Sequence, residues 1–244
     1  MRRGSKLWVL FIFVFVLASY VYYIYDFKLE NHSLFLSLST FLFAIFSGFF
    51  ISRQSRRYSQ LRDEIARFDG SSSTLYRSSG VFGDKIQNAV KKILTKHYNP
   101  ILKSGEWDYP LTHKTSTIID LMHLFDESFK NKKLHSVKSS TMSSLFRSFT
   151  YMQMSRKKMD ILHQERIPVL QWALLSFLSG ILLISVGAIS SVGMIVPAIL
   201  KGAFSTCIVL VLVILYQFNN LTFFENTIGE HSAKDVLDIM AGKR

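Results

Sequence analysis

The chain of 244 residues has a single cysteine, Cys207, and none of the short motifs that are typical of catalytic or cofactor-binding sites. One cysteine excludes an intrachain disulfide, and inside an apolar stretch such a residue is interpreted as a small packing side chain. The sequence has no HExxH pair, no GxSxG elbow, no Walker loop and no dinucleotide fingerprint. We therefore expect a protein that is not an enzyme and that uses no cofactor.

Residues that could bind a metal ion or transfer protons are scattered along the chain. Five of the seven histidines lie in the middle region, apart from one another and from the cysteine, namely His97, His113, His123, His135 and His163. This scatter argues against a zinc site, which needs several ligands at characteristic spacings. Asp126 and Glu127 are adjacent, so on a helix their side chains diverge, and a solvated face is favoured over an acid–base pair. The sequence predicts no metal site and no catalytic residues.

Charged side chains are almost missing from four long apolar stretches, at about 7–25, 34–51, 169–189 and 195–218, where Lys201 is the one charged residue. As a helix, an apolar run of about 18 to 20 residues matches the hydrocarbon thickness of a bilayer. We therefore expect an all-α membrane protein with four transmembrane helices. The scarcity of charge argues against a proton-driven transporter, which needs ionisable groups inside the bilayer.

The first and last of these stretches each carry a further signal. The first ends in several tyrosines and has no cleavage motif of small residues, which favours an uncleaved span with an aromatic belt over a signal peptide. Only residues 26–33 separate it from the second stretch, so the two are predicted to form a hairpin. Pro197, Lys201 and Gly202 interrupt the fourth stretch. We expect its beginning to be broken or partly interfacial, with a continuous core over 203–218.

Basic residues lie close to the spans on one side of the membrane only. They are Arg2, Arg3 and Lys6 before the first span, Arg53, Arg56, Arg57 and Arg62 after the second, and Arg156, Lys157, Lys158 and Arg166 before the third. The two outer connections carry only Lys28 and Lys201. By the positive-inside rule, both termini and the middle region are predicted to face the cytoplasm of a plasma (inner) membrane.

The middle region holds most of the chain's positive charge. Residues 53–168 contain 21 Lys and Arg against 11 Asp and Glu, which is +10 of the net charge of +12. A basic domain beside anionic lipid explains this balance, and no motif for recognising DNA or RNA is present. We therefore expect the lipid bilayer, and not nucleic acid, as the partner of this charge.

The chain is predicted to have four parts. They are a first transmembrane hairpin over 1–52, a helical cytoplasmic domain over 53–167, a second hairpin over 168–218 and a cytoplasmic tail over 219–244. Apolar residues recur at intervals of three and four in the middle region, which predicts helices and not strands. We expect helices over Arg53–Phe68, continuing the second span, over Asp84–Tyr98, ended by Pro100 and capped by Asp84, over 115–130, and over 139–165. The serine-rich stretch 70–83 is interpreted as a loop or a loosened helix.

The second span carries two kinds of helical row. Small residues recur at Ser33, Ser37, Thr40, Ala44, Ser47 and Gly48. Such a face lets neighbouring helices approach closely. Bulky residues recur at Phe41, Ile45 and Phe49. Rings of bulky apolar side chains can form a constriction that gates ions by dewetting. Ordinary helix packing or lipid contact explains either row equally well.

Four local patterns then coincide in order along the chain. They are Ser47-Gly48-Phe49-Phe50 leading into the arginines, Tyr98 followed by Glu106-Trp107, Ile167-Pro168 with Trp172, and Phe218-Asn219-Asn220 through Phe223, Ile228-Gly229 and Val236-Leu237. Over residues 35–240 this order resembles the bestrophin-like proteins, a group of membrane proteins related to the bestrophin channels. The resemblance implies a pentamer of four-helix subunits around one axial pore, with an apolar neck at Phe41, Ile45 and Phe49.

On this resemblance we expect a homo-oligomeric channel that conducts monovalent ions passively. Arg53, Arg56 and Arg57 would surround the cytoplasmic exit and favour anions there, although lipid phosphates, Asp63 or Glu64 could equally occupy these arginines. The acidic run that binds calcium in animal bestrophins has no counterpart, because Glu225, Glu230, Asp235 and Asp238 are spread out. The alternative is a non-conducting signalling or scaffold protein that acts through its basic cytoplasmic helices, and a membrane-embedded enzyme comes third.

Overall fold

The computed structural model describes residues 2–24, 32–113, 115–130, 136–189, 194–222 and 229–243, and within them it contains helices and no strand. The predicted all-α class is confirmed for these residues. By its contacts the chain divides into two compact units. We name them the apolar unit, residues 1–56 and 166–223, and the polar unit, residues 57–165 and 224–244.

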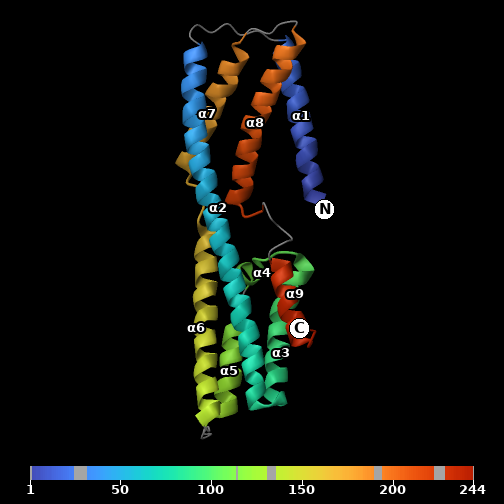
Figure 1. Cartoon of the computed structure of the whole chain (residues 1–244), viewed down its shortest axis with the longest axis vertical. Helices are drawn as coiled ribbons and strands as arrows, with labels where there is room; N and C mark the ends of the chain where they lie inside the picture. Colours follow the sequence, from blue (N-terminus) through green and yellow to red (C-terminus); the bar gives the residue numbers. More distant parts are fainter. Residues whose placement is uncertain are drawn as a thin grey trace. The chain divides into compact units, whose positions relative to one another are not determined.

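The apolar unit contains α1 (Arg2–Ile24), the first part of α2 (His32–Ser79), α7 (Val169–Gly187) and α8 (Ile195–Asn219) (Figure 1). By length and composition, α2, α7 and α8 could each cross a membrane. In α1, the apolar segment with described side chains is Ile12–Ile24. The apolar helices therefore lie where the sequence predicts them, and the count of four spans stays a prediction.

The core of the apolar unit is built where α2, α7 and α8 pack together. It is formed by Phe43 and Phe50 of α2, Leu175, Leu178 and Leu182 of α7, Ile208 and Leu215 of α8, and Ile167 just before α7. In a bilayer such contacts stabilise the helix pairs through close van der Waals packing and not through removal of side chains from water. Within a bilayer this packing sets which face of α2 turns inward, and so which face it leaves uncovered.

The prediction of a broken beginning for α8 is wrong. The helix is continuous from Ile195, and Pro197 lies in its first turn, where a missing backbone N–H costs nothing because it has no acceptor within the helix. Lys201 is buried, donates a hydrogen bond to the carbonyl of Ile189, and lies 5.5 Å from the ring centre of Tyr22. The Lys201 ammonium group therefore has partners within the protein, and the helix does not need to break around it.

Gly202 allows α1 and α8 to approach closely. A Cβ added to Gly202 would lie 3.0 Å from the Cβ and 3.1 Å from the Cα of Ser19 on α1. Nearby, the Tyr22 hydroxyl lies 2.9 Å from Ser205 Oγ and donates to the Leu183 carbonyl at 3.3 Å. The Tyr22 hydroxyl thus links α1 to α7 and α8 across the helices.

The polar unit contains the rest of α2, a 3₁₀ turn η1 (Gly80–Phe82), α3 (Asp84–Ser104), the short α4 (Tyr109–Thr112), α5 (Thr117–Phe129), α6 (Ser136–Gln164) and α9 (Gly229–Met240). Its core is apolar side chains from α2, α3, α5, α6 and α9, among them Leu61, Leu75, Leu94, Leu121, Leu145, Met152 and Val236. α9 packs against α3, and the Tyr76 hydroxyl of α2 donates to the Met240 carbonyl at 3.3 Å.

The interpretation of residues 70–83 as a loop or loosened helix is wrong over 70–79, where α2 continues unbroken to Ser79, and the chain leaves the α-helix only in the 3₁₀ turn Gly80–Phe82 and at Gly83. The hydroxyls of Ser71, Ser72 and Thr74 each donate to the carbonyl four residues earlier, at 2.8, 3.0 and 2.9 Å. Leu75 is fully buried among them. Tertiary packing therefore overrides the weak helix propensity of serine and glycine.

Two expectations about α3 are also wrong. Pro100 lies inside the helix, which continues to Ser104 and ends at Gly105 in the left-handed conformation, φ 68°. Tyr98 and Ile101 on either side of the proline are buried, and this packing compensates for the one backbone hydrogen bond that proline removes. Asp84 is the first helical residue and not the cap, since Gly83 holds the N-cap position without a side-chain bond.

Candidate functional site

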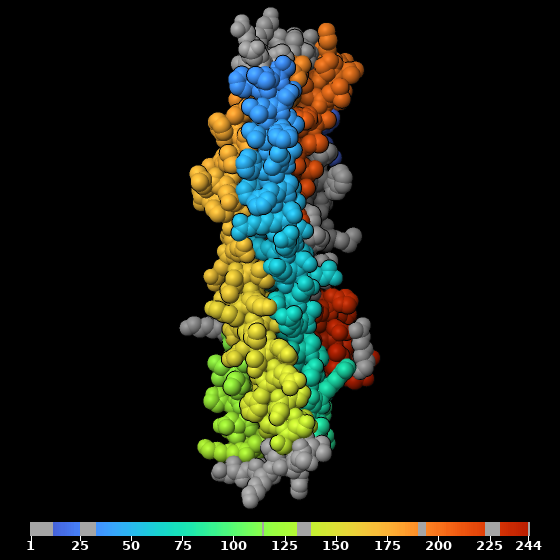
Figure 2. Space-filling view, turned by 60° about the vertical axis from the view of Figure 1, so that its left-hand side comes forward, coloured from blue at the N-terminus to red at the C-terminus, as the bar shows by residue number. Residues whose placement is uncertain are grey.

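The predicted neck residues lie on a face of α2 that the rest of the described chain leaves uncovered. Phe41, Ile45 and Phe49 are 62%, 50% and 58% exposed, whereas Phe43 and Phe50 are buried in the core. Figure 2 shows this part of α2, in blue, uncovered by other described helices on one side of the apolar unit. Exposure is required both for pore lining and for lipid contact, so the neck assignment stays a prediction.

The small residues of α2 are divided between two environments. Ser47 is buried and donates to the Ala44 carbonyl at 3.3 Å, and the Thr40 hydroxyl donates to the Leu36 carbonyl at 2.6 Å. Ala44 and Gly48, by contrast, are exposed beside the bulky row. A Cβ added to Gly48 would meet nothing within 4 Å. The flank of the bulky row is therefore open to the approach of another helix.

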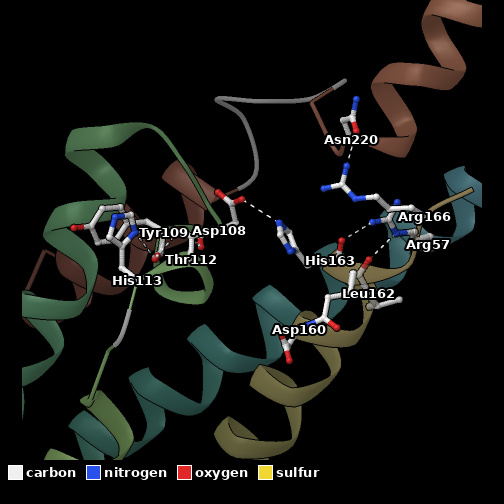
Figure 3. Close-up of polar contacts among 11 residues, drawn as sticks. Arg57, Asp108, Tyr109, Thr112, His113, Asp160, Leu162, His163, Arg166 and Asn220 are labelled. Atoms are coloured by element: carbon white, nitrogen blue, oxygen red, sulfur yellow. Dashed lines mark hydrogen bonds and ion pairs between the residues drawn. The ribbon is translucent and has the colours of Figure 1, made fainter.

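The three arginines after the second span are not equivalent. Arg53 and Arg56 are exposed, but Arg57 is 3% exposed. Its Nε donates to the Leu162 carbonyl at 2.6 Å and its Nη2 to the His163 carbonyl at 3.0 Å (Figure 3). These carbonyls belong to the last turn of α6, where no intrahelical donor remains. In the folded chain Arg57 caps α6, and its role at a channel exit stays a prediction.

Replacing Arg57 by alanine should destabilise the protein far more than replacing its exposed neighbour Arg56. Loss of the guanidinium leaves two carbonyls without their charged donor, at a cost of about 2–4 kcal/mol. This should lower the melting temperature by roughly 5–10 °C, measured by thermal unfolding in detergent. Arg56→Ala is the matched control and should change it by less than about 2 °C. Equal melting temperatures for the two variants would contradict the capping role.

Two of the family-like patterns meet in the fold of the apolar unit. The Asn219 side-chain oxygen accepts a bond from the Ile167 backbone N–H at 2.7 Å. The Asn220 side-chain oxygen accepts one from Arg166 at 2.7 Å, as Figure 3 shows. The pair of asparagines at the end of α8 thus holds the start of α7. Sequence reasoning recognised both patterns, but no local signal showed that they bind each other.

Tyr98 lies in a buried polar cluster of the polar unit that sequence reasoning missed. The Tyr98 hydroxyl donates to Asp69 Oδ1 at 2.7 Å, and the Ser232 hydroxyl of α9 donates to Asp69 Oδ2. Burial raises the pKa of Asp69 to about 6, against the lowering effect of the two hydroxyls. The carboxylate therefore connects α2, α3 and α9, and nothing near Asp69 in the sequence indicates this.

His97 lines the same cavity as Asp69, but burial lowers the pKa of His97 whereas it raises that of Asp69. Its Nδ1 lies 3.0 Å from Thr117 Oγ1, and burial followed by the charge of Arg156 lowers its pKa to about 4. The cavity has a volume of about 40 Å³, and Tyr98, Trp107 and Ala233 also line it. At neutral pH the cluster thus holds an uncharged imidazole and a buried carboxyl group whose pKa, about 6, lies near the pH of the solution.

The connection that contains Glu106-Trp107 packs against the end of α6. His163 Nε2 lies 3.2 Å from Asp108 Oδ2, and this hydrogen bond is the main cause that lowers the pKa of Asp108 (Figure 3). The Trp107 and His163 rings meet edge to face with centres 5.9 Å apart. Glu106 is exposed. Among the described residues, no group of three or more His, Cys, Asp and Glu is arranged to hold a metal ion.

Comparison with known proteins gives one positive result. Residues 30–221 match the family model described as the Bestrophin-like domain. No curated protein and no solved structure matches the chain. The matched region includes α2 to α8, and so contains the exposed row of α2, the capping Arg57 and the asparagine contacts at the ends of α7 and α8.

Proposed function

The chain belongs to the bestrophin-like family, and on this premise we propose that it is an ion channel, assembled as a pentamer around an axial pore. The pore would be lined by α2, with Phe41, Ile45 and Phe49 forming its apolar neck. α1 would be a fourth span beside α2, α7 and α8. Both termini and the polar unit would face the cytoplasm of the plasma (inner) membrane. The protein itself is a membrane protein of this family, and these finer features are the proposal.

The observation that carries the proposal is the continuous exposed row along α2. Phe41, Ile45 and Phe49 are followed at spacings of four and three by Arg53 and Arg56, and all five are exposed. Such spacing keeps them on one side of a helix. An apolar stretch that leads directly into positive charge suits a dewetted neck followed by an electropositive exit.

The flank of this row supports close packing of several α2 helices. Ala44 and Gly48 are exposed beside the bulky side chains, and small residues let helix backbones approach in a bilayer. The described residues of the apolar unit contain no Asp or Glu. Within this unit no described carboxylate would offset the positive charge of Arg53 and Arg56 at the exit of such a pore, and this charge favours anions there.

Ion flux through reconstituted protein tests the proposal. Liposomes loaded with chloride, or separately with potassium, should release their ion faster when they contain the purified protein than when they contain none. Images of the detergent-purified particle should show a ring with an axial opening. An intact ring that conducts neither ion would overturn the channel and favour the non-conducting scaffold, and a monomeric particle would overturn the assembly.

A further inference from the structure

The last helix, α9, lies against α3 in the polar unit and is held there by apolar and polar contacts (Figure 1). Ala233, Val236 and Met240 of α9 are buried, and the Tyr76 hydroxyl of α2 donates to the Met240 carbonyl at 3.3 Å. The helix has 12 residues, and helices of about this length are marginal in water on their own. Such a segment can open locally at a smaller cost in free energy than unfolding of the whole unit.

A buried carboxyl group lies at the contact between α9 and the rest of the unit. Asp69 of α2 is 8% exposed and accepts hydrogen bonds from the Tyr98 hydroxyl of α3, at 2.7 Å, and from the Ser232 hydroxyl of α9. Burial raises the pKa of Asp69 to about 6, and these two hydroxyls lower it. A buried carboxylate without a cation beside it is costly, whereas the protonated form is not.

Charged groups of the neighbouring helices do not offset this cost. Among the described residues, none of the charged or titratable side chains of α9 contributes to the pKa of Asp69, and these are Glu230, His231, Lys234, Asp235 and Asp238. From α3, Tyr98 and His97 lie at the same cavity, and from α6 the charge of Arg156 acts on His97. The ionised form of Asp69 is therefore disfavoured as long as α9 covers it.

The cavity beside Asp69 has α9 as part of its wall. Its volume is about 40 Å³, and its lining includes Asp69, Tyr98, Trp107 and, from α9, Ala233. Movement of α9 away from α3 removes Ala233 from this wall and Ser232 from the carboxyl group, so it exposes Asp69 to water. Water solvates a carboxylate far better than a protein interior does. Displacement of α9 therefore favours ionisation of Asp69, and ionisation favours the displacement.

The neighbouring His97 is not released by the same movement. Its Nδ1 lies 3.0 Å from Thr117 Oγ1 of α5, its ring centre lies 5.4 Å from that of Phe68 on α2, and Arg156 of α6 acts on its charge. These partners belong to α5, α2 and α6. Loss of α9 thus relieves the burial of Asp69 and not that of His97, whereas unfolding of the whole unit relieves both.

We propose that α9 is a proton-controlled strap of the polar unit, held on α2 and α3 while Asp69 carries its proton and loosened when Asp69 ionises. The closed form binds the proton more tightly than the open form, so the strap is held best below about pH 4 and least above about pH 6. Between these limits a pKa raised from 3.8 to about 6 makes opening up to about 100-fold more frequent. This role does not depend on ion conduction or on oligomeric assembly.

Hydrogen exchange of the α9 amides tests the strap, measured by mass spectrometry on the full chain in detergent between pH 4 and pH 7. After correction for the intrinsic pH dependence of exchange, protection of α9 should fall by about ten-fold or more as the pH rises. Residues 140–155 of α6 should keep their protection. Asp69→Asn should abolish the dependence, because an amide does not ionise. Asp63→Asn, which replaces an exposed carboxyl on the same helix, is the matched control and should keep it, as should His97→Gln.

Ser232→Ala is a second variant that tests the strap even if Asp69→Asn folds poorly. The Ser232 hydroxyl lowers the pKa of Asp69, so its removal should move the fall in α9 protection to higher pH, and an unmoved response would contradict the proposal. Equal α9 protection at pH 4 and pH 7 in the unmodified protein would overturn it, and so would a pH dependence that persists in Asp69→Asn. A parallel fall in α6 would also overturn it, since that result requires opening of the whole unit.

Discussion

Replacing Phe41, Ile45 and Phe49 together by alanine should raise ion flux through the protein by about ten-fold or more. A narrow apolar constriction excludes water, and a barrier of about 1.4 kcal/mol already reduces passage ten-fold. Each of the three side chains is at least half exposed in the single chain, so its removal leaves no cavity in the core. The folded subunit should therefore survive the substitution, and the change should appear in conductance.

Single-channel recording in planar bilayers, with liposome flux as a second measure, gives the readout. The matched control replaces Leu170, Phe177 and Ile184 of α7 by alanine, because these side chains are also exposed, at 82%, 67% and 63%. In the proposal they face lipid, and their loss should leave conductance unchanged. Unchanged ion flux through a correctly assembled neck variant would refute the assignment of this row to the pore. An equal rise in ion flux in both triple variants would refute it as well.

Asp69→Asn and His97→Gln should give the protein opposite dependences of stability on pH. In the folded chain the pKa of Asp69 is raised from 3.8 to about 6. The folded state then binds this proton more tightly than the unfolded state, so the Asp69 contribution is greatest below about pH 4 and is lost as the pH rises through about 6. This rise in the pKa of Asp69 corresponds to a change of about 3 kcal/mol in the free energy of unfolding.

His97 acts in the reverse sense. Its pKa is lowered from 6.5 to about 4 in the folded chain, so the folded state binds the proton less tightly. The His97 contribution is present above about pH 6.5 and is lost as the pH falls toward 4, again by about 3 kcal/mol. In the unmodified protein the two effects oppose each other over the same range, and this cluster should therefore contribute little net pH dependence.

Thermal melting between pH 4 and pH 7 measures the two slopes. Asp69→Asn leaves only the histidine, so this variant should lose stability on acidification. His97→Gln leaves only the carboxyl, so this variant should gain stability on acidification relative to the unmodified protein. The double variant is the control and should follow the unmodified curve in shape. Parallel curves for both single variants would show that these two groups do not titrate as their burial requires.

Much of the helical framework was predictable because it depends on local patterns. Apolar runs of sufficient length mark α2, α7 and α8, and the continuation of α2 through Arg53–Phe68 follows from its periodicity. The ordered patterns from Ser47 to Asn220 led to the family that the match over residues 30–221 confirms. The boundaries that failed at the serine-rich end of α2 and at Pro100 are places where propensity and packing disagree. The break expected at Pro197 failed for another reason, because a proline in the first turn of a helix removes no intrahelical hydrogen bond.

Hydrophobic length, helical period and the order of short patterns are properties of the linear chain, and they are enough to identify an all-helical membrane protein of the bestrophin-like family. Three contacts become visible only in the packed fold: Arg57 caps α6, Asn219 and Asn220 hold the start of α7, and Asp69 joins three helices. Each of these contacts links residues more than 50 positions apart or depends on burial. Burial and distant pairing arise only when the helices pack, so no local pattern carries them.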